Sequence, residues 1–113
     1  MANKHTEILK KLKDIQNVLR HAIEQAPAGK ERDDYIHKFK EVNHVINVLE
    51  AREFFNVTLP KDIKDSVARL NTITEDVKKE SGRIEDITKR VDKFNEYVGY
   101  AVKLIEYVVK VVA

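Results

Sequence analysis

The residues best placed to do chemistry are His37, Glu41 and His44. Spacings of four and three residues put them on one face of a helix, and Glu-x-x-His is the spacing used in carboxylate-bridged di-iron bundles. On a helical wheel Glu41 and His44 lie within about 40° of His37, on the side away from the apolar residues of the same segment. The sequence also has no second Glu-x-x-His. The pattern therefore favours a solvated polar face, and we expect no bound metal and no cofactor.

Other catalytic patterns are missing from the sequence. It contains no His-Glu-x-x-His zinc motif, no Gly-x-Ser-x-Gly nucleophile and no phosphate-binding glycine loop. The lack of cysteine excludes thiolate ligands and cysteine nucleophiles. The acidic side chains lie beside lysines at spacings of three and four, which is ordinary surface pairing on helices. We therefore predict that the protein is not an enzyme.

The charge pattern does not indicate a polyanionic partner. The 21 basic and 19 acidic side chains leave a net charge of only +2. The densest basic cluster is Lys10, Lys11 and Lys13, and Glu7 and Asp14 interrupt it. Nucleic acid is therefore not expected as a partner.

The elements that carry these residues are predicted to be helices in one all-α domain covering residues 1–113, because the chain is 42% hydrophobic and 35% charged with three glycines and two prolines. A first amphipathic helix is expected over 4–25, ending before Pro27 and Gly29. A second is expected over 30–57. The short turn between them favours an antiparallel hairpin. The apolar stripe of the second helix is Tyr35, Phe39, Val42, Ile46 and Leu49, joined by Phe54, Phe55 and Val57.

A seven-residue repeat of apolar residues dominates the rest of the chain, beginning after Pro60. Alternating steps of three and four keep such residues on one side of a helix, as in a coiled coil. We expect a long coiled-coil helix over about 60–112, with a break at Ser81–Gly82, giving a four-helix up-down-up-down bundle, as the alternative. The repeat is Ile63, Leu70, Val77, Ile84, Val91, Val98, Ile105 and Val112.

The last seventeen residues, 97–113, are apolar at thirteen positions. The four exceptions are Gly99, Lys103, Glu106 and Lys110, and they fall within an arc of about 60° on a helical wheel. A surface helix needs a much narrower apolar stripe than this. We therefore expect protein or lipid to cover this helix on nearly all sides.

These patterns predict a non-enzymatic helical protein that assembles with copies of itself or with a helical protein partner through its C-terminal helix. The alternative is a protein that associates with membranes or forms pores through the same segment. A cytoplasmic location is expected, because the N-terminus shows no signal peptide pattern and the chain has no cysteine. The predicted interface residues are Ile84, Ile87, Val91, Phe94, Val98, Ala101, Val102, Ile105, Val108, Val109 and Val112.

Overall fold

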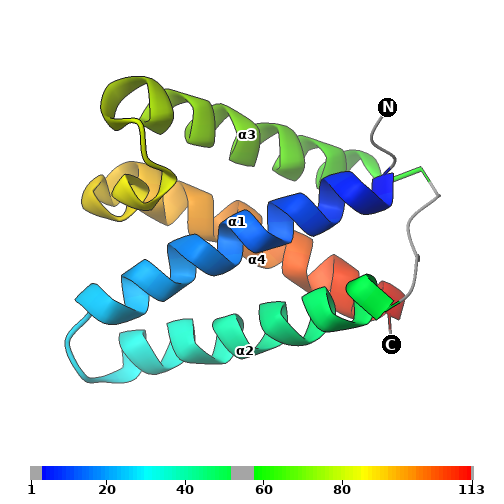
Figure 1. Cartoon of the computed structure of the whole chain (residues 1–113), viewed down its shortest axis with the longest axis horizontal. Coiled ribbons are helices and arrows are strands. Elements are labelled where there is room, and N and C mark those ends of the chain that lie inside the picture. Colours follow the sequence, from blue (N-terminus) through cyan, green and yellow to red (C-terminus); the bar gives the residue numbers. More distant parts are fainter. Residues whose placement is uncertain (1–3, 52–57, 113) are drawn as a thin grey trace.

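A computed structural model describes residues 4–51 and 58–112 of the chain. The described residues form helices and no strand, which confirms the all-α class. In chain order the elements are α1 (Lys4–Gln25), α2 (Lys30–Ala51), α3 (Lys61–Ser81), the 3-10 helix η1 (Ile84–Lys89) and α4 (Val91–Val112). Successive α-helices run in opposite directions along the molecule (Figure 1).

The first two helices follow local sequence signals. α1 has the predicted bounds, and it ends before a turn in which Gly29 adopts a φ of 152°. Glu31 and Asp33 supply negative charge in the first turn of α2, where the helix dipole favours it. The two helices pack along each other. The predicted end of the second helix at 57, with its three apolar residues Phe54, Phe55 and Val57, lies outside the described residues.

The continuous coiled-coil helix over 60–112 is wrong, and the chain breaks at Ser81–Gly82 as in the alternative expectation. Pro60 stands just before α3. At the other end Gly82 takes a left-handed conformation with φ 80° and ψ −3°, which glycine adopts at little cost. Its N–H donates to the carbonyl of Lys78 at 2.8 Å. The glycine thus ends α3 and redirects the chain.

The apolar repeat crosses this break without a continuous helix. Val77 ends the buried row of α3, and the short helix η1 then buries Ile84 and Ile87 by itself. Val91, the next member of the repeat, is 71% exposed. The seven-residue spacing of Val77, Ile84 and Val91 therefore does not reflect one continuous helix face, because Val77 is buried and Val91 is exposed.

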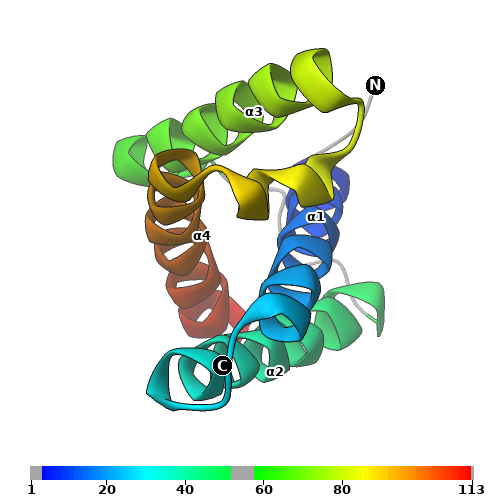
Figure 2. The same ribbon diagram turned by 90° about the vertical axis from the view of Figure 1, so that its left-hand side faces the viewer.

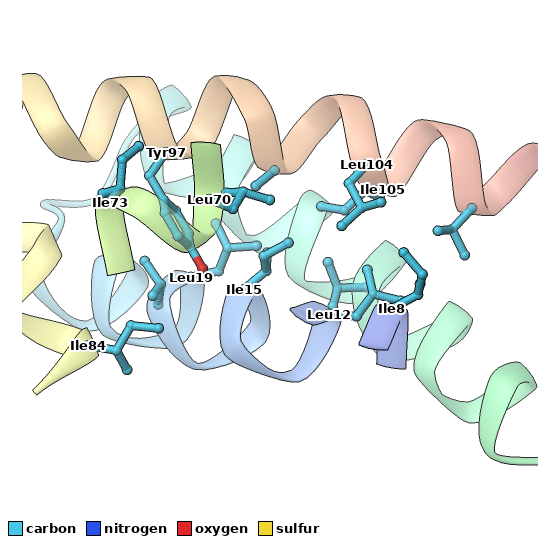
Figure 3. Packing of buried hydrophobic residues seen from close by; sticks show 14 of the residues in the cluster. Ile8, Leu12, Ile15, Leu19, Leu70, Ile73, Ile84, Tyr97, Leu104 and Ile105 are labelled. Atoms are coloured by element: carbon cyan, nitrogen blue, oxygen red, sulfur yellow. The ribbon is translucent and has the colours of Figure 1, made fainter. Parts of the chain in front are cut away.

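The four α-helices enclose one core in the order α1, α2, α4, α3 around the bundle (Figure 2), with η1 packed against α1, α3 and α4. Ion pairs join α3 to Arg90 and to the first turn of α4. Lys93 Nζ lies 3.5 Å from Asp76 Oδ2, and Arg90 pairs with Glu80. Side chains from α1, α3, η1 and α4 meet in the centre (Figure 3). Each fully buried leucine or isoleucine there stabilises the fold by roughly 1.5–3 kcal/mol.

Candidate interaction surface on α4

The predicted interface residues divide into two groups. Six of them are buried in the chain's own core and are therefore covered by the other helices: Ile84, Ile87, Phe94, Ala101, Ile105 and Val108. Val91 is exposed, whereas Val98, Val102, Val109 and Val112 are half-buried. The inner side of α4 is thus occupied, and only the second group could contact another molecule. Whether it does so stays a prediction.

Four of these valines form a continuous row along α4, which we call the valine edge: Val91, Val98, Val102 and Val109. Steps of seven, four and seven residues keep them within about 40° on a helical wheel. The row adjoins the buried face, since Val98 and Val109 also pack against the core. Val91 is the single large hydrophobic residue classed as exposed in the described part of the chain. Apart from Val91, the large apolar side chains of the described residues are buried or half-buried.

A pocket of about 270 Å³ lies at the head of the valine edge. Ala22 of α1, Tyr35 of α2, and Val91 and Phe94 of α4 are among the residues that line it. The rings of Tyr35 and Phe94 meet edge to face, with centroids 5.8 Å apart and an interplanar angle of 76°. The Tyr35 hydroxyl donates to Glu31 Oε1 at 2.8 Å, and burial together with this carboxylate raises the pKa of Tyr35 to about 12. The pocket therefore has an aromatic wall with its polar end turned to Glu31.

A second row on α4 is charged, and we call it the charged edge: Asp92, Glu96, Lys103 and Lys110. These side chains are exposed, and they also fall within about 40° on the helical wheel. Both acidic residues precede Gly99 and both lysines follow it. Lys103 Nζ lies 5.8 Å from the centroid of the Tyr100 ring. Within the described residues, none of the four makes an ion pair.

The histidine trio of α2 faces outward as predicted. His37 and His44 are exposed. Glu41 is half-buried, and its Oε1 lies 3.2 Å from Lys38 Nζ and 3.3 Å from His37 Nε2. The carboxylate is thus engaged by neighbours on its own helix. Over residues 4–51 and 58–112, no group of three or more histidine or acidic side chains is arranged to hold a metal ion.

A polar groove of about 230 Å³ lies between α1 and α3, and it was not predicted from the sequence. Its lining includes Lys10, Lys11 and Asp14 from α1 and Lys78 from α3. Lys11 is only 8% exposed, and its Nζ lies 3.7 Å from Asp14 Oδ2. Burial lowers the pKa of Lys11, the Asp14 carboxylate opposes that shift, and Lys10 and Lys78 add to it. The groove therefore holds a partly desolvated ammonium beside the Asp14 carboxylate.

A signal for this burial was present in the sequence. Lys11 falls about 40° from Ile15 on the helical wheel, and seven residues before the buried Val18. Because Lys11 is basic, it was assigned to the surface cluster with Lys10 and Lys13. Its position on the helical wheel instead lies beside the apolar stripe of α1. Lysine can accept such a site because its long stem is apolar.

None of the described helices combines the length and the apolar character needed to cross a bilayer. Comparison of the chain with protein-family models, with curated proteins and with solved structures finds no match.

Proposed function

We propose that this protein is a non-enzymatic assembly module that associates with copies of itself through the valine edge of α4. The observation that carries the proposal is the continuity of that edge: an exposed Val91 leads into three half-buried valines along one helix. A single exposed apolar residue is common on protein surfaces and needs no explanation. A row of four that continues an aromatic-walled pocket is a different feature, because its members can be buried together by one helix.

The size of the effect supports association without a permanent complex. Burying a valine side chain that is free in water contributes about 1.5 kcal/mol or more. Val91 supplies most of this gain, since the other three valines have already lost part of their exposure within the chain. Two copies that bury their edges against each other gain from both. We therefore expect a reversible dimer at micromolar concentrations rather than an assembly that persists at any dilution.

Sedimentation velocity over a range from micromolar to sub-millimolar concentration tests the proposal. The average mass should rise above the 13.1 kDa of one chain. The Val91→Ser and Val102→Ser variants should shift that rise to concentrations at least about tenfold higher, because each removes an apolar contact twice in a symmetric dimer. Val67→Ser is the matched control, since Val67 is a half-buried valine of α3 in the α1–α3 groove.

Two results would overturn the proposal. One is a constant mass of a single chain throughout the concentration range. The other is a dimer that Val67→Ser weakens as much as Val91→Ser does. Flotation with phosphatidylcholine and phosphatidylglycerol vesicles covers the membrane alternative. We expect the chain to stay with the unbound fraction, and valine-dependent binding to the vesicles would favour membrane association instead.

A further inference from the structure

The middle of α4 contains a glycine that the chain itself does not require. Gly99 is exposed and has neither a positive φ nor any atom within 4 Å of the position that a Cβ would occupy. A glycine within a helix costs about 1 kcal/mol relative to alanine. Such a residue is expected where another backbone approaches closely. Since no backbone of residues 4–51 and 58–112 does so here, we take the approaching element to belong to another molecule.

Gly99 also lies between the two rows already described. On the helical wheel the valine edge and the charged edge are separated by roughly 110°, and Gly99 falls in the strip between them, together with Asn95 and Glu106. This strip points away from the buried face of α4. A helix that packed on it would touch the glycine in the middle, valines on one side and charges on the other.

From this arrangement we infer that the second copy packs its α4 antiparallel against this one, with the two helices crossing at Gly99. The inference rests on the proposed self-association and adds the orientation. A two-fold axis perpendicular to antiparallel helices brings each side of a helix onto the same side of its partner. The valine edges then meet each other, and the charged edges meet each other. A parallel pair would instead place the charged edge of one copy over the valines of the other.

The order of charges along the helix distinguishes the orientations further. When the two Gly99 residues are opposed, Glu96 of one copy stands level with Lys103 of the other, because they lie three and four residues on either side of the glycine. Asp92 of one copy stands level with Glu106 of the other and about 6 Å along the axis from its Lys110, so attraction and repulsion occur together there. Each pair forms twice by symmetry. A parallel pair would turn each charged edge toward the partner's valines and form no such ion pairs, so the Glu96–Lys103 pairs belong to the antiparallel arrangement alone.

Charge reversal provides the decisive test. Glu96→Lys alone and Lys103→Glu alone should each weaken the dimer about tenfold, since each replaces two attractive pairs by two repulsive ones. The double variant Glu96→Lys, Lys103→Glu in one chain should return the dissociation constant to the value of the unmodified protein, because the pairs are restored with reversed sign. High salt should shrink all of these differences. Sedimentation equilibrium measures the constants.

Gly99 itself gives an independent readout. Gly99→Ala should raise the melting temperature of the dilute monomer, because alanine favours the helix, and should weaken the dimer several-fold. The absence of cysteine allows a clean cross-linking test. Gly99→Cys should form a disulfide-linked dimer under mild oxidation, since a disulfide needs Cα atoms within about 7 Å. Lys110→Cys, at the far end of the same face, should not cross-link to its own copy.

The outcomes separate this inference from the proposed function. A dimer in which the double charge variant is as weak as the single ones, or weaker, and in which Lys110→Cys cross-links as readily as Gly99→Cys, would overturn the antiparallel arrangement and leave self-association standing. A dimer whose dissociation constant is unaffected by every substitution on α4, those of the valine edge included, would overturn both the antiparallel arrangement and the proposed function. A chain that stays monomeric at every concentration would also overturn both.

Discussion

α1 and α4 face each other across the core (Figures 2 and 3). They differ in which residues break the rule that apolar side chains are buried and polar ones exposed. α1 buries polar groups, namely His5 and Lys11, beside its apolar stripe. α4 buries one face completely and leaves valines at the surface. Burying a charge and exposing an apolar edge both cost free energy in an isolated chain. We therefore expect association at the outer edge of α4 and sensitivity to pH in the α1–α3 groove.

The largest expected effect concerns the division of α4 into an inner and an outer side. Ile105 is fully buried, so Ile105→Asp would place an unpaired carboxylate in the core and should destabilise the fold by roughly 4 kcal/mol or more. Val98→Asp should cost about 1–2 kcal/mol, because the half-buried site lets the new charge reach water. Urea unfolding monitored by circular dichroism measures both.

Lys103→Asp serves as the control on the outer side. It should change the free energy of unfolding by no more than about 0.5 kcal/mol. Equal losses at positions 98, 103 and 105 in the dilute monomer would contradict the division of α4, because a helix without an inner side would respond alike all round.

The second prediction concerns Tyr97, the polar exception on the inner side of α4. The residue is 1% exposed and extends towards α1 (Figure 3), and its hydroxyl has no hydrogen-bond partner in the described part of the chain. Leaving such a group buried costs about 1–3 kcal/mol, and the loss of the oxygen leaves only a small void. Tyr97→Phe should therefore raise the free energy of unfolding at neutral pH by about 1 kcal/mol.

The pH dependence of stability provides a check on this assignment. Burial, and to a smaller degree the charge of Asp14, raise the pKa of Tyr97 above its usual value of about 10. Above that pH the unfolded chain releases a proton that the folded chain keeps, so stability should fall as the pH rises. Tyr97→Phe should reduce this fall. Tyr35→Phe should also reduce the alkaline fall, because the pKa of Tyr35 is raised to about 12, but without a gain at neutral pH since Tyr35 already donates to Glu31.

Helix ends that are set by residues nearby in the sequence could be predicted. The bounds of α1 and the turn at Pro27 and Gly29 follow from local backbone chemistry, and both were predicted. The break at Ser81–Gly82 was expected only as an alternative. A glycine is tolerated within a helix, as at Gly99, and it is also the residue that can end one, as at Gly82. The choice depends on whether Ile84 and Ile87 gain more by packing as η1 than by extending α3, which is a tertiary property.

The candidate surface could be predicted only in part. The apolar breadth of α4 was visible, but the fraction that the chain covers for itself was not, because it depends on how α3 and η1 fold back. Six of the eleven predicted interface residues lie in the core for this reason. Lys11 was assigned by residue type, although its wheel position on the flank of α1 indicated burial.

The smallest expected effect concerns Lys11, one of the two buried polar residues of α1. Its pKa is lowered below 10.5, chiefly by burial. Between the folded pKa and 10.5 the unfolded chain binds the additional proton, so the contribution of Lys11 to stability rises with pH over this interval.

Lys11→Met should remove that rise while retaining an unbranched apolar stem of similar length. At neutral pH it should increase the free energy of unfolding by a few tenths of a kcal/mol, within the usual range for a partly compensated site. Lys13→Met, at an exposed position on the same helix where the lysine pairs with Glu50 and does not shift Lys11, is the matched control and should leave the slope just below pH 10.5 as it is in the unmodified protein. A Lys11→Met variant that is less stable at neutral pH and keeps the full alkaline rise would mean that the pair with Asp14 outweighs the cost of burial, and the contrast between α1 and α4 would then lose its energetic basis.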